Sequence, residues 1–103
     1  QIEFLDNYGE QQIILDPGIG FNKSMKSNFE LLNNIEDYRV NNLPVLIGIS
    51  RKSMIYKTLK TTPQEALNGT TVLNTIALMK GADILRVHDV KEAVEAVKLV
   101  NEL

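Results

Sequence analysis

Three short polar clusters contain the residues that could do chemistry in this chain, and each follows an apolar run directly. They are Asp16, then Ser50-Arg51-Lys52-Ser53, and then Arg86, His88 and Asp89. Arginine, lysine and histidine donate hydrogen bonds and suit phosphate, whereas a carboxylate accepts bonds from N–H groups. Together, the clusters predict a site for a polar, anionic ligand.

The first cluster opens the segment DPGIGF, residues 16–21, which ends the apolar run Ile13-Ile14-Leu15. Pro17 has a fixed φ and the glycines Gly18 and Gly20 tolerate positive φ, so this segment predicts a shaped loop. In folds with parallel strands, ligands bind at the carboxyl ends of the strands. Asp16 is therefore the first candidate site residue. The alternative is that it only caps a turn.

The third cluster lies at the end of a run in which side chains alternate between two faces. Arg86 and His88 share one face, and Val87 points to the other. Ionisable groups beside a core are costly unless a partner or a ligand satisfies them. One alternative is an internal ion pair of Asp16 with Lys52 or Arg86, and another is a hydrogen-bonded core histidine.

Composition excludes several classes of protein. The 103 residues suffice for one small domain, and the net charge of −2 argues against nucleic acid or an anionic membrane as partner. With no cysteine and one histidine, the chain cannot form a thiolate or His-rich metal site. No apolar run approaches the ~20 residues of a membrane span, and no signal peptide is visible, so the cytoplasm is the expected location.

Periodicity predicts the elements that position the clusters. Three strands are predicted, over Gln12–Asp16, Val45–Ile49 and Ile84–His88. A helix end over Gln1–Tyr8, with Gly9 as its stop, precedes the first strand, and a helix capped by Ser27 and running to about Tyr38 follows it. Between the second and third strands lie a short helix over Met54–Leu59 and a helix that begins at Thr62-Pro63-Gln64-Glu65, has a weak point at Gly69 and ends at Gly81; a last helix begins with Asp89 and Glu92.

Strands that alternate with helices predict an α/β fold with a parallel sheet and right-handed crossovers. A free-standing flavodoxin-like domain of this size would carry about five strands, two more than the sequence offers. A (β/α)₈ barrel needs about 250 residues. Because the polar ends of all three strands meet at one rim, residues 1–103 are predicted to be the last three β-α units of a single TIM-barrel domain.

The segments DPGIGF, PVLIGISRKS and ADILRVHDV resemble the three carboxyl-terminal motifs of the dihydropteroate synthase family of pterin-binding barrels. The resemblance runs from about Gln12 to the end of the chain. It implies an enzyme of folate biosynthesis, which joins p-aminobenzoate to 6-hydroxymethyl-7,8-dihydropterin pyrophosphate and releases pyrophosphate. Sulfonamides compete for the p-aminobenzoate position in this family.

The resemblance also implies roles for single residues. Asp16 would accept hydrogen bonds from the pterin ring, and Lys52 would reach that ring and border the p-aminobenzoate site. Arg86 would stack on the pterin and, with His88, hold the pyrophosphate, so Lys52, Arg86 and His88 are the expected catalytic residues.

The remaining expected contacts belong to the same motifs. Phe21 would pack against the benzoate ring, Ser53 would meet its carboxylate at a helix start, and Ser50 would line the pocket. Gly20, Gly48 and Arg51 complete the expected substrate-binding set.

The resemblance implies Mg²⁺ as cofactor, with ligands mainly from barrel strands outside this sequence and from the pyrophosphate, and a homodimer through carboxyl-terminal helices. The first five strands of the barrel are not in this sequence, so the 103 residues alone are expected neither to fold stably nor to catalyse. Two alternatives are a methyltetrahydrofolate methyltransferase domain and a non-catalytic pterin-binding paralogue or barrel fragment.

Overall fold

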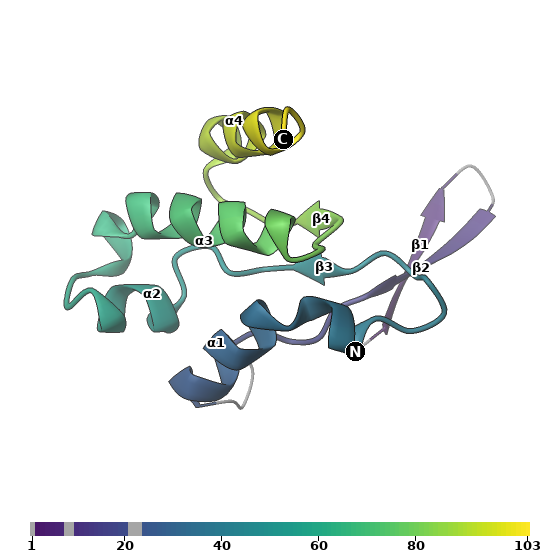
Figure 1. Ribbon diagram of the computed structural model, residues 1–103, viewed down its shortest axis with the longest axis horizontal. Coiled ribbons are helices and arrows are strands. Elements are labelled where there is room, and N and C mark those ends of the chain that lie inside the picture. Colours follow the sequence, from purple (N-terminus) through teal and green to yellow (C-terminus); the bar gives the residue numbers. More distant parts are fainter. Residues whose placement is uncertain (1, 8–9, 21–23) are drawn as a thin grey trace.

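The computed structural model describes residues 2–7, 10–20 and 24–103 of the chain. The elements are β1 (Ile2–Asn7), β2 (Glu10–Leu15), α1 (Met25–Asn33), β3 (Leu46–Ile47), α2 (Ser53–Thr58), α3 (Leu67–Met79), β4 (Ile84–Leu85) and α4 (Val90–Val100), with 3₁₀ turns at Ile35–Tyr38 and Pro63–Glu65. Figure 1 shows β3 and β4 side by side, with α1 and α3 to either side of β3.

The predicted parallel arrangement is confirmed. β3 and β4 pair in parallel, with Leu46 opposite Ile84 and Ile47 opposite Leu85. The end of β2 joins them through a parallel bridge from Leu15 to Val45. The connections between these strands are helical, so the order β2-β3-β4 is that of successive β-α units. β3 and β4 are shorter than the strands predicted over Val45–Ile49 and Ile84–His88, whereas β2 begins two residues before the strand predicted over Gln12–Asp16 and ends one residue before its end.

The helix predicted over Gln1–Tyr8 is wrong. Residues Ile2–Asn7 form β1, which pairs antiparallel with β2 from Ile2 opposite Leu15 to Asn7 opposite Glu10. Apolar residues three apart are too few to separate a helix from a strand, and the neighbouring apolar run offered a pairing partner. The predicted stop at Gly9 lies outside the described residues.

Helix α1 begins one turn earlier than predicted. Its N-cap is Ser24, in the extended conformation, and the hydroxyl of Ser24 accepts a hydrogen bond from the amide of Ser27 at 3.1 Å. Ser27 is thus the third helical residue and not the cap. The helix ends at Asn33, and the predicted continuation to Tyr38 is the 3₁₀ turn.

The two middle helices are close to the predictions. Helix α2 lies one residue before the predicted span, and Pro63 begins a 3₁₀ turn that precedes α3. Gly69, the predicted weak point of α3, has a packing reason. A β-carbon there would lie 2.5 Å from Cγ2 of Ile55, so the glycine lets α3 approach α2 closely.

The apolar core lies between the strands and helices α1 to α3. Its most buried side chains come from β3, helices α1 and α2 and the segments beside them, and they include Leu31, Ile35, Val45, Ile47, Ile49 and Met54. This burial is what places the ends of three separate strands at one rim.

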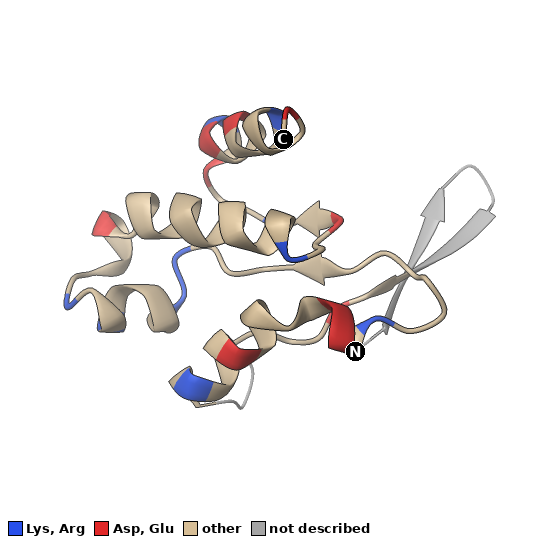
Figure 2. Ribbon diagram, viewed as in Figure 1, with Lys and Arg blue, Asp and Glu red and all other residues tan. Residues whose placement is uncertain are grey.

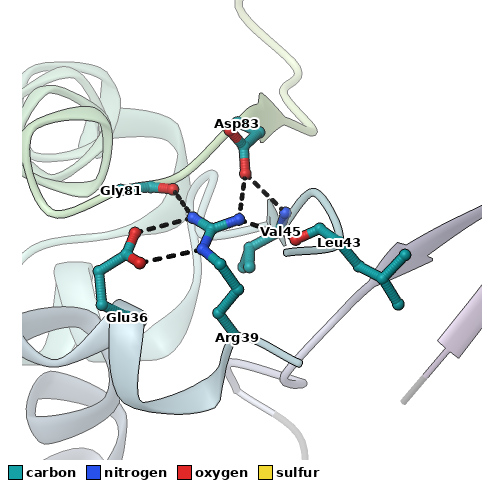
Figure 3. A network of polar contacts seen from close by, with 6 residues as sticks. All are labelled: Glu36, Arg39, Leu43, Val45, Gly81 and Asp83. Atoms are coloured by element: carbon teal, nitrogen blue, oxygen red, sulfur yellow. Dashed lines mark hydrogen bonds and ion pairs between the residues drawn. The ribbon is translucent and has the colours of Figure 1, made fainter. Parts of the chain in front are cut away.

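A polar network joins the amino-terminal ends of β3 and β4 (Figure 3). The guanidinium of Arg39 donates to both carboxylate oxygens of Glu36, to Asp83 at 2.8 Å, and to the carbonyls of Leu43 and Gly81. Asp83 also accepts a bond from the amide of Val45 at 2.9 Å. One arginine therefore joins three separate segments at the amino-terminal ends of the strands.

Helices α1 and α4 each carry both acidic and basic residues (Figure 2). Within the described ranges, the structure contains no helix with the length and apolar character of a membrane span.

Candidate active site

The polar clusters meet at the carboxyl-terminal ends of the parallel strands. A cavity of about 120 Å³ lies there. Its lining comes from the segments after β3 and β4, and comprises Gly48, Ser50, Lys52, Arg86, Val87 and His88. Asp16, at the end of β2, lies within ion-pair distance of this group through Arg86. Five of the predicted site residues thus line one cavity, and a sixth reaches it from the adjacent strand.

Asp16 is a buried carboxylate, with 3% of its surface exposed. Its Oδ1 accepts a hydrogen bond from the amide of Gly18 at 2.8 Å, and its Oδ2 lies 3.8 Å from Nη1 of Arg86. The turn-capping and ion-pairing alternatives are therefore both present in the structure. Because 3.8 Å exceeds hydrogen-bond length, the pair leaves Oδ2 able to accept a donor from a ligand.

Lys52 crosses the loop that follows β2. Its ammonium group donates a hydrogen bond to the carbonyl of Ile19. Burial, followed by the charge of Arg86, lowers the pKa of Lys52, and the charge of Asp16 opposes this only in part. A basic group with a lowered pKa in a cavity is a common feature of functional sites.

Gly20 makes the close passage of Lys52 possible. Its φ is +86°, and a β-carbon there would lie 2.8 Å from Cδ of Lys52. The amide of Gly20 donates to Oδ1 of the buried Asn28 at 2.8 Å, which fixes the loop against α1. Phe21, the next predicted contact, lies outside the described residues.

Ser50 and His88 form a hydrogen-bonded pair across the cavity. The hydroxyl oxygen of Ser50 accepts a bond from the amide of His88 at 3.2 Å and lies 2.7 Å from Nδ1 of its ring. A hydroxyl that accepts from the amide can donate its own hydrogen to Nδ1. In that arrangement the neutral ring carries its proton on Nε2, where it is available to an anionic group.

Arg86 lies against the backbone of Gly48. A β-carbon at Gly48 would be 2.7 Å from Nη2 of Arg86, so the absence of a side chain makes room for the guanidinium. Half of the Arg86 side chain is exposed. A planar guanidinium presented in this way can stack on a ring or bind phosphate oxygens in pairs.

Arg51 and Ser53 lie outside the cavity lining that the described residues form. The guanidinium of Arg51 binds both oxygens of Asp89, at 2.9 and 3.0 Å, and the carbonyls of Pro63 and Gln64. Ser53 is the first residue of α2.

The sequence and the structure both match known proteins. The family model of the pterin binding enzymes matches residues 5–88. The chain belongs to the pterin-binding enzyme family.

Two relatives of this chain are dihydropteroate synthases. The chain is 47% identical over 91 residues to the dihydropteroate synthase of Escherichia coli K12, an alignment that covers 88% of this chain and 32% of the relative. It is 44% identical over 93 residues to that of Clostridium beijerinckii, covering 89% and 35%. The chain thus spans about a third of the length of these two curated relatives.

Solved structures agree with the sequence matches. The 7,8-dihydropteroate synthase of Vibrio fischeri ES114 superposes with a TM-score of 0.82 at 46% identity, over 86% of this chain and 33% of the other. The Thermus thermophilus enzyme in complex with 6HMPPP gives 0.82 at 36% identity, over 89% and 37%. The predicted resemblance and the predicted fold, part of a TIM barrel, are confirmed.

Two residues that support the candidate site were missed by sequence reasoning. Asn28 holds Gly20, and the buried Thr70 accepts a bond from the amide of Arg51 at 3.0 Å. Asn28 left a weak signal as a polar residue beside the apolar stripe of α1. Thr70 left none, because a threonine within a helix is ordinary.

The described residues contain no group of three or more His, Asp or Glu side chains that could hold a metal ion. Asp16, at the end of β2, contacts the amide of Gly18 and the guanidinium of Arg86. The side chains of this part of the site do not by themselves fit the Mg²⁺ that the resemblance implies.

Proposed function

We propose that this chain forms part of the active site of a dihydropteroate synthase. The reaction condenses p-aminobenzoate with 6-hydroxymethyl-7,8-dihydropterin pyrophosphate to form dihydropteroate and pyrophosphate. The observation that carries this proposal is the meeting of a buried carboxylate, Asp16, with the cationic groups of Lys52 and Arg86 and the His88 ring at one cavity rim. The similarity to dihydropteroate synthases over most of the chain supports it.

Asp16 is the proposed pterin ligand. The amino group and the adjacent ring N–H of a pterin present two donors side by side, and a carboxylate offers two acceptors with the same spacing. Burial of Asp16 removes competing water and strengthens such a pair of bonds. Gly18 holds one carboxylate oxygen in place before the ligand arrives.

Arg86 and His88 are the proposed leaving-group ligands. The amine nitrogen of p-aminobenzoate forms a bond to the exocyclic methylene carbon of the pterin, the bond from that carbon to the pyrophosphate oxygen breaks, and the amine loses a proton. Negative charge accumulates on the departing oxygen. Donors already oriented toward that position, the Arg86 guanidinium and Nε2–H of His88, lower the barrier.

Lys52 is the proposed link between the two substrates. Its side chain runs from the β3-α2 loop to the carbonyl of Ile19 in the pterin-side loop. In this arrangement it contacts the pterin ring and borders the benzoate. Phe21 is proposed to pack on the benzoate ring and Ser53 to meet the benzoate carboxylate at the start of α2.

The implied partners are small molecules, including sulfonamides, which a relative from Yersinia pestis is described as binding. Mg²⁺ is proposed as cofactor, with ligands other than the residues of this part of the site. A cytoplasmic homodimer is the proposed setting of the complete enzyme.

The test is a product assay on the full-length protein. With both substrates supplied, we expect dihydropteroate, detected by chromatography, and pyrophosphate in equal amounts. The variant Lys52→Ala is expected to raise KM for both substrates and to lower kcat at least about tenfold, since it loses a charge-assisted contact. Pterin binding without product would favour a non-catalytic paralogue, and methyl transfer to a corrinoid partner would favour a methyltransferase.

A further inference from the structure

The segments after β3 and β4 carry the four polar side chains that line the cavity. Ser50 and Lys52 come from the first segment, and Arg86 and His88 come from the second. The strands themselves pair over only two residues each, which is before these segments begin. Contacts beyond the strand ends must therefore hold the two halves of the cavity in register.

Arg51 and Asp89 provide such a contact on the outer side of the cavity. Nε and Nη2 of Arg51 bind the two oxygens of Asp89 at 2.9 and 3.0 Å, in the bidentate geometry that fixes both groups. Arg51 lies between Ser50 and Lys52 in sequence, and Asp89 follows His88 directly. Any shift of this pair is transmitted to the cavity through one covalent step on each side.

The surroundings of Arg51 show that its position is built and specific. Its φ is +55°, a left-handed conformation that non-glycine residues rarely adopt. Its amide donates to the buried hydroxyl of Thr70, and Nη1 donates to the carbonyls of Pro63 and Gln64. Helix α3 and the preceding turn thus hold the arginine from behind while it holds Asp89.

Asp89 binds Arg51 and does not cap the amino terminus of α4 with its side chain. It is the residue before α4, where its sequence position predicts a helix cap, yet its side chain makes no capping hydrogen bond. Its carboxylate faces Arg51 instead, and the Arg51 hydrogen bonds lower its pKa, so the pair stays ionised well below neutral pH.

We propose that Arg51 and Asp89 are positioning residues, which hold Lys52 and His88 in one arrangement and do not themselves touch substrate. This inference rests on the proposed function for its kinetic readout. It assigns Arg51 a different role from the direct substrate contact that the sequence motif predicts.

The experiment is a double-mutant cycle in the full-length protein with Arg51→Met, Asp89→Asn and both together. We expect each single variant to lower kcat about tenfold or more, because small displacements of catalytic groups are costly, while KM for both substrates changes little. Since the two residues act through each other, the double variant should lose no more than the worse single variant.

The matched control is Asp83→Asn, which weakens an Arg–Asp pair at the opposite ends of the same strands. It should lower thermal stability and leave kcat unchanged at a temperature where all variants are folded. Arg51→Lys, which keeps the charge and loses the fork, should recover part of the activity.

A second readout does not depend on turnover. The ring resonances of His88, assigned by comparison with His88→Gln, should stay in place in Asp83→Asn and shift in the same direction in Arg51→Met and Asp89→Asn. These two variants change the local charge in opposite senses, so a common shift reports the loss of the Ser50–His88 hydrogen bond and not the charge change. The inference is overturned if the His88 resonances do not move in Arg51→Met and Asp89→Asn, or if kcat per folded molecule is unchanged in both. It is also overturned if Arg51→Met raises the KM for one substrate and Asp89→Asn does not, since Arg51 would then contact that substrate directly. A wild-type protein that forms no dihydropteroate would contradict the proposed function, and the His88 shift would still decide the positioning role.

Discussion

At the scale of single residues, the candidate site contains a buried carboxylate, that of Asp16. Asp16 has one oxygen held by the amide of Gly18 and the other at ion-pair distance from Arg86. A buried carboxylate is costly to keep unless its remaining acceptor capacity is used. This is the property expected of a ligand-binding group, in contrast to a carboxylate that serves only a turn.

The first residue-scale prediction concerns Asp16. Asp16→Ala in the full-length enzyme should weaken pterin binding roughly 10- to 100-fold, the effect of losing charge-assisted hydrogen bonds. Titration calorimetry with 6-hydroxymethylpterin measures this directly. The exposed Asp37, changed to alanine, is the matched control and should bind normally. Normal pterin binding by Asp16→Ala would remove Asp16 from the site.

At the scale of elements, the ends of β3 and β4 are fitted to one another through Gly48 and Arg86. The guanidinium occupies the space that a side chain at Gly48 would take. The strand pairing therefore does more than build the sheet. It sets the plane in which Arg86 is presented to a ligand.

Gly48→Ala tests this fit. The new methyl group would approach Nη2 of Arg86 to 2.7 Å, and the flexible arginine would move while the fold is retained. We expect kcat to fall about tenfold, as for other small displacements of a catalytic group, with a nearly unchanged melting temperature. In an Arg86→Ala background the same change should have no further effect on kcat. If Gly48→Ala lowered kcat about tenfold both in the wild type and in Arg86→Ala, the effect would not act through Arg86.

At the scale of the whole molecule, the two ends of the strands have different tasks. The carboxyl-terminal ends carry the cavity, and the amino-terminal ends carry the Arg39 network (Figure 3). Hydrogen bonding to Arg39 lowers the pKa of Glu36. For Asp83, burial raises the pKa, but the bonds from Arg39 and the Val45 amide outweigh it and the pKa is lowered. This network stabilises the fold through charge.

The sign of its pH dependence follows from those shifts. A carboxylate with a lowered folded pKa stabilises the protein above its unfolded pKa, about 4, and this contribution is lost as the pH falls through the folded value. Arg39→Met should therefore reduce the free energy of unfolding by about 1 kcal/mol at pH 7, because two part-buried carbonyls lose their donor while solvent screens the loss at the exposed carboxylates. Denaturant unfolding at several pH values should show the difference from wild type narrowing below about pH 4. A difference that is constant with pH would mean that the loss is one of packing only.

The sequence by itself determined the class of the fold and indicated five of the six residues that line the cavity. Apolar runs that end in polar residues reported the three parallel strands, and the motifs around Asp16, Lys52 and Arg86 reported the family, since both signals are local along the chain. It could not report β1 or the cap at Ser24, because a few residues with mixed periodicity fit more than one element.

Only the tertiary structure decided how the site residues are used. Arg51 and Lys52 are neighbours in one sequence motif, yet Arg51 binds Asp89 outside the cavity lining while Lys52 lines the cavity. The pairing of Ser50 with His88 likewise joins residues 38 positions apart. These pairings depend on which partners the packed strands and helices bring within hydrogen-bond distance, and that distance cannot be inferred from residue type and spacing.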